Sequence, residues 1–126
     1  MTKTARVVLG ALLAAVLFGC GRSEPPVSFS KDVKPVLDRR CGECHSPGQP
    51  GYEASQLSFD TYDGLMKGTR FGAVVVPGDS LGSTLVVLVE GRADPSIAMP
   101  HGDAEPLRQS EIDAIKKWIE QGAPNN

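Results

Sequence analysis

The feature that most constrains this chain is a five-residue motif, Cys41-Gly42-Glu43-Cys44-His45. Two cysteines three positions apart, followed directly by a histidine, form the C-x-x-C-H pattern typical of covalent c-type haem attachment. The spacing puts both thiols on one side of a helical turn, from which they can form thioethers along one edge of a porphyrin. The histidine then offers an imidazole nitrogen to the iron. The motif therefore predicts one covalent haem c held by Cys41, Cys44 and His45.

The other chemistries open to a C-x-x-C pair are a disulfide, half of a zinc site or a thioredoxin-like redox pair. A structural zinc site needs about four protein ligands. Outside the motif, only Cys20 and His101 offer a further thiol or imidazole. A thioredoxin-like motif requires a βαβ pattern around the pair, and the sequence has none. Haem is therefore the favoured interpretation.

The first 19 residues predict an export signal. Lys3 and Arg6 precede an apolar run over residues 7–18, which is shorter than the roughly 20 residues of a membrane-spanning helix. The run ends in Leu17-Phe18-Gly19-Cys20, which resembles a bacterial lipoprotein processing site. Residues 1–19 are thus expected to be removed and Cys20 to carry lipid. The alternative is ordinary secretory cleavage, which would leave Cys20 as a free thiol.

Export also suits the haem motif, because this kind of attachment occurs on the exported side of the bacterial membrane. The expected location is therefore periplasmic, with the membrane reached through the lipid. Cleavage removes two basic and no acidic residues, so 11 basic residues remain against 15 acidic ones, a formal charge of −4. That charge argues against nucleic acid as a partner. Residues 20–28 are expected to form a lipidated tether and residues 29–126 the domain.

Hydrophobic periodicity predicts that this domain is mostly helical. Val33, Leu37 and Cys41 fall at i, i+4 and i+8, so one apolar stripe leads into the motif from a helix capped by Ser30. Four cations lie mostly off this stripe: Lys31, Lys34, Arg39 and Arg40. They are expected to form a solvated face, or alternatively a weak docking surface for an acidic redox partner.

Two short helices are predicted in the middle of the chain. The first is capped by Asp60 or Thr61 and stops at Gly68. The second covers residues 80–90, since an isolated apolar strand there would have no partner to pair with. Few aromatic residues are available for the core, so a covalently held porphyrin is expected to supply missing apolar mass.

The terminal helix has the clearest pattern. Ile112, Ile115 and Ile119 repeat at i, i+3 and i+7, and Gly122 marks the end. Its expected start is Ser110, or one or two residues earlier.

Haem iron with one histidine has a second face to fill, and the polar loop at residues 92–106 carries the candidates. Met99, followed by a proline, would give an electron carrier with a raised potential. His101 would give a bis-histidine haem, and an open face would give ligand binding or oxygen chemistry. Met99 is favoured over these two alternatives. A backbone carbonyl of residues 46–51 is expected to accept the second ring N–H of His45.

Together these motifs resemble the planctomycete-type cytochrome c domain, a single-haem relative of class I cytochromes c. The resemblance rests on residues 29–37, the C-x-x-C-H motif, and residues 57–68, 74–80, 99–100 and 111–124. It implies a small all-α cytochrome c-like fold, thioethers at Cys41 and Cys44, and axial ligation by His45 and Met99. The chain departs from the family pattern at His101, where a second proline is usual. It also departs at Arg108, where a serine or threonine is usual.

The sequence as a whole predicts a lipid-anchored, single-haem c-type cytochrome. It would carry electrons between redox partner proteins on the periplasmic side and would catalyse no reaction of its own. The alternative is a haem-based sensor, or a gas-binding or weak peroxidase module, which requires a labile sixth ligand.

Overall fold

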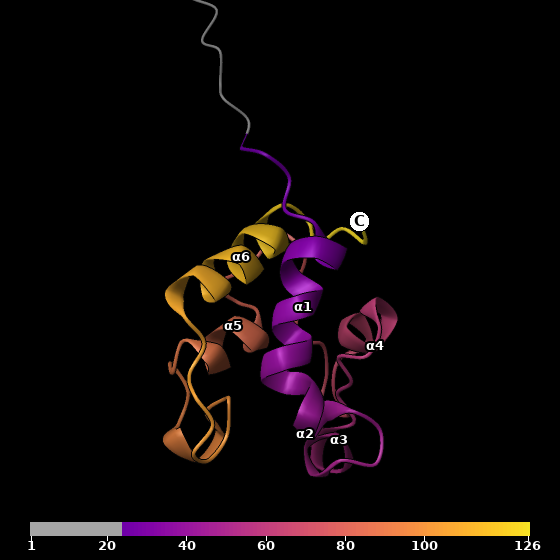
Figure 1. Ribbon diagram of the computed structural model, residues 1–126, viewed down its shortest axis with the longest axis vertical. Helices are drawn as coiled ribbons and strands as arrows, with labels where there is room; N and C mark the ends of the chain where they lie inside the picture. The colour runs from indigo at the N-terminus through magenta and orange to yellow at the C-terminus, as the bar shows by residue number, and fades with distance from the viewer. Residues whose placement is uncertain (1–23) are drawn as a thin grey trace, which may run out of the picture.

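The computed structural model describes residues 24–126, which form a small helical domain (Figure 1). Its α-helices, in chain order, are α1 (Lys34–Leu37), α2 (Glu43–His45), α3 (Pro50–Ser55), α4 (Tyr62–Lys67), α5 (Thr84–Val89) and α6 (Gln109–Glu120). The described residues contain no extended strand, only isolated β-bridges at Thr69–Gly72 and Val76–Asp79. The expected all-α fold is confirmed.

The helix that leads into the C-x-x-C-H motif runs unbroken from Phe29 to His45. Two π-helical turns, Phe29–Val33 and Asp38–Gly42, flank α1 and join it to α2. The N-cap is Ser28 and not the predicted Ser30. The Ser28 hydroxyl accepts a hydrogen bond from the Lys31 N–H, while Asp32 accepts one from the Ser28 N–H at 2.8 Å. These two hydrogen bonds satisfy two backbone N–H groups at the start of the helix, which explains why Ser28 and not Ser30 is the cap.

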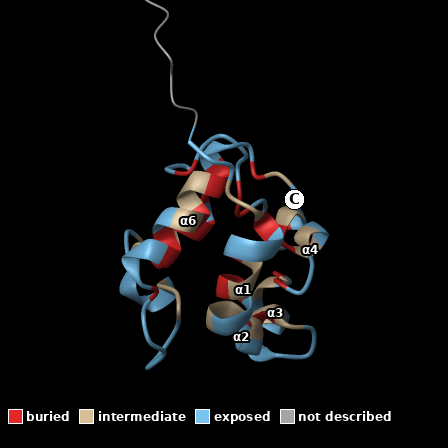
Figure 2. Ribbon diagram, turned by 45° about the horizontal axis from the view of Figure 1, so that its top comes forward, coloured by how far each residue is buried: buried red, intermediate tan, exposed pale blue. Residues whose placement is uncertain are grey.

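The buried core forms where α6 packs against the start of this first helix and against α5 (Figure 2). Trp118 of α6 is fully buried, and its ring lies 5.3 Å from that of Phe29, centroid to centroid. Tyr62 of α4 meets Phe29 edge to face at 5.2 Å. The predicted stripe contributes Val33 and Leu37, both without exposed surface.

The last helix, α6, begins at Gln109, one residue before Ser110, as the earlier of the two predicted starts allowed. Arg108 is the N-cap, and its backbone N–H donates to the Glu111 carboxylate at 2.9 Å. Ser110 therefore lies inside the helix. At the other end, Gly122 has a positive φ of 92°, which ends the helix as predicted.

Of the two middle helices, the first is confirmed and the second begins later than predicted. Thr61 caps α4 by accepting a hydrogen bond from the Gly64 N–H at 3.0 Å, and Gly68 ends the helix. By contrast, α5 begins at Thr84 and not at residue 80. Residues 79–83 instead form a turn, in which Asp79 accepts hydrogen bonds from the Gly82 N–H and, through its carbonyl, from the Ser83 hydroxyl.

Within residues 24–126, no helix has the length and apolar character needed to cross a membrane. The predicted signal peptide, residues 1–19, and Cys20 lie outside the described residues.

Candidate functional site

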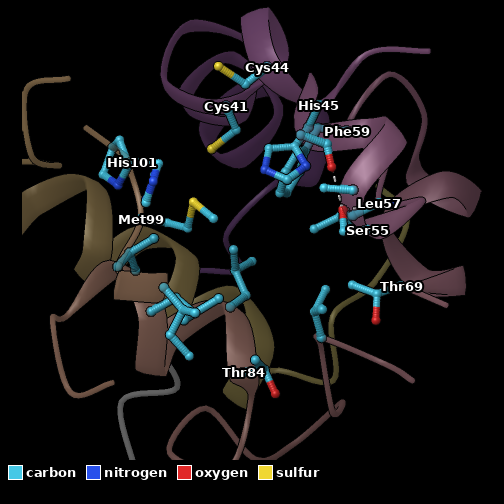
Figure 3. A pocket seen from close by; sticks show the side chains of 18 of the residues that line it. Cys41, Cys44, His45, Ser55, Leu57, Phe59, Thr69, Thr84, Met99 and His101 are labelled. Atoms are coloured by element: carbon cyan, nitrogen blue, oxygen red, sulfur yellow. Dashed lines mark hydrogen bonds between the residues drawn. The ribbon is translucent and has the colours of Figure 1, made fainter. Parts of the chain in front are cut away.

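The two cysteines of the motif lie at the end of the first helix, close to a cavity. Cys41 is half-buried and Cys44 is exposed, and neither forms a disulfide with another described residue. Burial raises the pKa of the Cys41 thiol to about 12, so that thiol is uncharged at neutral pH. Both side chains project from one side of the helix, as the spacing of the motif predicts (Figure 3).

The cavity has a volume of about 590 Å³, which is in the range typical of cofactor sites. Its walls are mostly apolar and come from segments far apart in the sequence. They include Leu57, Phe59, Val74, Leu85, Leu88 and Leu107. Cys41, Cys44 and His45 lie on one side of this space, and Met99 and His101 also line it (Figure 3). The fold thus brings every predicted haem-site residue to one apolar cavity.

His45 is buried, and its imidazole lacks a full set of partners. Burial lowers the pKa of the ring, and a hydrogen bond with the Leu57 backbone acts weakly in the opposite direction. Phe59 packs edge to face against the ring at 5.3 Å. Among residues 24–126, the Nδ1 atom of His45 is the one buried side-chain nitrogen or oxygen without a hydrogen-bond partner. An unpaired buried nitrogen is costly, which indicates that the ring is built to meet another group.

The prediction that a carbonyl of residues 46–51 would accept from this imidazole is not confirmed; the backbone group that raises the pKa of the ring belongs to Leu57. The reason lies in α3, which begins at Pro50 and uses the nearby carbonyls within the helix. The Gln49 carbonyl accepts from the Glu53 N–H, and the Gly51 carbonyl accepts from the Ser55 hydroxyl. Leu57 follows the helix outside regular secondary structure.

The two candidate sixth ligands differ in exposure. Met99 is half-buried and its side chain projects into the cavity opposite His45, whereas His101 is exposed at the edge (Figure 3). The Met99 N–H donates to the Leu88 carbonyl at 3.5 Å, a long hydrogen bond. The structure therefore brings both side chains to the cavity with Met99 deeper, and ligation by either residue stays a prediction.

These observations test whether the site fits a covalent haem. Two unpaired thiols, a buried imidazole with an unsatisfied nitrogen, and a thioether all meet at one apolar cavity. Thiolate-derived thioethers, histidine and methionine are the protein groups that hold haem c. The residues present fit the group.

The model of the family described as Planctomycete cytochrome C matches residues 41–103, half of the 126-residue chain. The chain belongs to this family. Family membership supports haem as the cofactor of this cytochrome c domain, and the match runs from the first cysteine of the motif to just beyond Met99.

Among solved structures, the chain is similar to a hydrazine synthase chain from Kuenenia stuttgartiensis, with a TM-score of 0.53 and 23% sequence identity. The similarity covers 77% of this chain but only 16% of that one. At this identity the likeness concerns the fold alone. No curated protein matches the chain.

Three residues important to the site escaped the sequence analysis. Gly51 lies directly against His45, because a Cβ atom at position 51 would be only 3.1 Å from its Cε1 atom. Arg40, expected on a solvated face, instead pairs with the buried carboxylate of Glu111 at 3.2 Å. The turn-forming residues around Gly51 gave no indication that it contacts His45. Arg40 and Glu111 lie 71 residues apart, so no local pattern predicts their ion pair.

Proposed function

We propose that this protein is an exported, lipid-anchored cytochrome that carries electrons through a single covalent haem c. The observation that supports this most strongly is the arrangement of His45 and Met99 on opposite sides of one apolar cavity (Figure 3). Cys41 and Cys44 border the same cavity. A six-coordinate iron between these two side chains would change little in geometry between its oxidation states, which suits a carrier and not a catalyst.

Each side chain has a distinct role in this proposal. Cys41 and Cys44 would hold the macrocycle as thioethers, and His45 and Met99 would ligate its iron. When bound, the haem supplies one-electron exchange between ferric and ferrous iron. The apolar walls exclude water from the metal, and the Leu57 carbonyl helps to orient the His45 ring.

The anchor and the location belong to the same proposal. Lipid on Cys20 would tie the domain to the periplasmic face of a membrane. Residues 24–26, just before the domain, are exposed, in keeping with a tether. Redox partner proteins would then donate and accept electrons at the cavity edge, where Cys44 is exposed. Cys20→Ser should move the haem-loaded protein from the membrane fraction to the soluble periplasmic fraction; unchanged membrane association would contradict lipidation.

One observation favours the alternative of a sensor or weak peroxidase. No backbone–backbone hydrogen bond joins residues 100–107 to any other described residue. The loop that carries Met99 is therefore lightly tied, and a labile sixth ligand would open the iron to small molecules. Carbon monoxide separates the two functions. Prompt stoichiometric binding to the reduced protein at neutral pH favours the sensor, and slow or absent binding favours the carrier.

The basic test is to produce the protein in a host with haem-attachment machinery. A denaturing gel stained for haem, with mass spectrometry of the purified chain, should show one haem per polypeptide, and a redox-titrated visible spectrum should show one reversible step. A bare polypeptide would refute the proposal.

The ligand assignment is tested with a matched pair of variants. Met99→Ala should abolish the long-wavelength iron–sulfur band of the oxidised protein and lower its potential, because thioether ligation favours the ferrous state. His101→Ala is the control and should leave the band in place. The opposite pattern would assign the sixth position to His101.

A further inference from the structure

A buried carboxylate joins the haem-attachment helix to the terminal helix. Glu111, at the start of α6, is only 4% exposed. Its carboxylate accepts hydrogen bonds from Arg40 Nε at 3.2 and 3.4 Å and from an Arg108 guanidinium nitrogen at 3.0 Å. A guanidinium nitrogen of Arg39 lies 3.5 Å away. Three cations thus face a single anion at this junction.

The pKa of Glu111 indicates that this ion pair is stable at neutral pH. The Arg108 side chain, with further hydrogen bonds from the Arg108 backbone and Arg40, lowers the pKa of Glu111 to about 2 against the opposing effect of burial. The carboxylate is therefore ionised across the physiological range. Planar guanidinium groups suit such a site, because they donate several hydrogen bonds in a fixed geometry.

Arg40 differs from the other two arginines because it also holds the loop. One of its guanidinium nitrogens lies 3.1 Å from the Glu105 carboxylate, in the segment between Met99 and α6. Arg40 directly precedes Cys41, so one side chain connects the haem-attachment motif to both ends of the Glu105–Glu111 segment. This segment lacks backbone ties up to residue 107, so side-chain contacts must locate it.

We propose that Arg40 is a positioning residue that keeps the Met99 loop closed over the cavity and so keeps the thioether on the iron. This inference rests on the proposed function, since it takes Met99 as the sixth ligand. Arg40 itself lines no part of the cavity. It acts through Glu105 and Glu111, which fix the loop's C-terminal end relative to Cys41.

The test uses haem-loaded Arg40→Leu, in which Glu111 keeps Arg108 as its partner. The iron–sulfur band should weaken, and the fraction of reduced protein with an open sixth position should rise roughly tenfold, a typical size for coupling between sites. Carbon monoxide binding should then be faster by the same factor, because its apparent rate follows the open fraction. Arg40→Lys keeps the positive charge but not the planar guanidinium group, and it should recover part of the iron–sulfur band.

A matched control separates positioning from general loss of stability. Val33 is fully buried in the first helix but lines no part of the cavity. Val33→Ala should lower the free energy of unfolding in guanidinium while leaving the band and the carbon monoxide rate at wild-type values. Weakening of the band in Val33→Ala as large as in Arg40→Leu would mean that Arg40 acts only through stability.

The outcomes also separate this inference from the proposed function. A wild-type protein without the iron–sulfur band would overturn both, because Met99 would not be the ligand. A wild-type band that persists unchanged in Arg40→Leu, with wild-type carbon monoxide kinetics, would overturn the positioning role alone.

Discussion

Gly51 allows α3 to lie directly against the helical turn that carries His45. A Cβ atom built at position 51 would be 2.7 Å from the Cys44 carbonyl oxygen and 3.1 Å from His45 Cε1. The first distance is shorter than carbon–oxygen contacts allow, and the atom it meets is rigid backbone. Gly51→Ala therefore forces α3 away from α2 and shifts the imidazole.

The magnitude follows from two opposing terms. Forcing an extra methyl group into a packed site costs about 1–3 kcal/mol. Alanine is a better helix former than glycine by up to about 1 kcal/mol, which offsets part of that cost. We expect Gly51→Ala to lower the free energy of unfolding of the haem-loaded protein by about 1–2 kcal/mol. It should also change the visible spectrum, since the iron ligand moves.

Gly42 provides the matched control, since it lies between the two cysteines with helical backbone angles. The nearest atom to a Cβ atom at position 42 is the Leu37 carbonyl oxygen at 3.9 Å, an ordinary contact. Gly42→Ala should therefore keep the wild-type spectrum and raise the stability by about 0.5–1 kcal/mol. Guanidinium titration monitored by circular dichroism measures both variants. Equal stability and an unchanged spectrum in Gly51→Ala would refute the steric argument.

Three further predictions concern pH, capping and the cofactor. The pKa of Glu111, lowered to about 2 mainly by the Arg108 side chain, lies below its ordinary 4.5. The ion pair should therefore add about 3 kcal/mol above pH 4.5, and this should be lost as the pH falls towards 2. The excess unfolding free energy of wild type over Glu111→Gln should shrink in that window; a pH-independent difference would contradict this. Thr61→Ala removes the cap of α4 and should cost about 1 kcal/mol in the same titration, with Thr61→Ser near wild type; equal losses would exclude capping. The haem-free double variant Cys41→Ser/Cys44→Ser should lose near-ultraviolet circular dichroism and exchange its amide hydrogens quickly, whereas a native-like spectrum would show that the domain needs no haem to fold.

The sequence predicted those parts of the fold that depend on local patterns. The isoleucine repeat of α6 and the cap of α4 at Thr61 are confirmed because their determinants lie within one or two helical turns. The predicted cap of the first helix, Ser30, was wrong, because Ser28, which the sequence pattern did not single out, exchanges hydrogen bonds with Lys31 and Asp32. Contacts from the far end of the chain also meet this region, since the Ser30 N–H donates to the Asn126 carbonyl at 2.9 Å. Such a contact has no signature in a window of neighbouring residues.

The candidate site divides in the same way. Cys41, Cys44 and His45 form a contiguous motif, and the sequence therefore identified them before any geometry was available. The effect of the Leu57 backbone on the pKa of His45 was missed, because a backbone group has no side-chain identity and its position depends on where α3 ends. A fold with known helix boundaries is needed before such a partner can be named.

The arrangement of buried residues explains why the haem and the fold should depend on each other. Trp118 and Ile115, which have no exposed surface, pack where α6 crosses the first helix. At the other end of the first helix, Leu85 and Phe59 are buried but face the cavity. These walls come from segments far apart in the sequence, and a bound macrocycle would be a contact common to them. Substitutions at Ile115 should therefore weaken the protein with or without haem, whereas substitutions at Leu85 should chiefly weaken the haem-loaded form. Denaturant titrations of both forms measure this contrast, and equal losses at Leu85 in the two forms would contradict it.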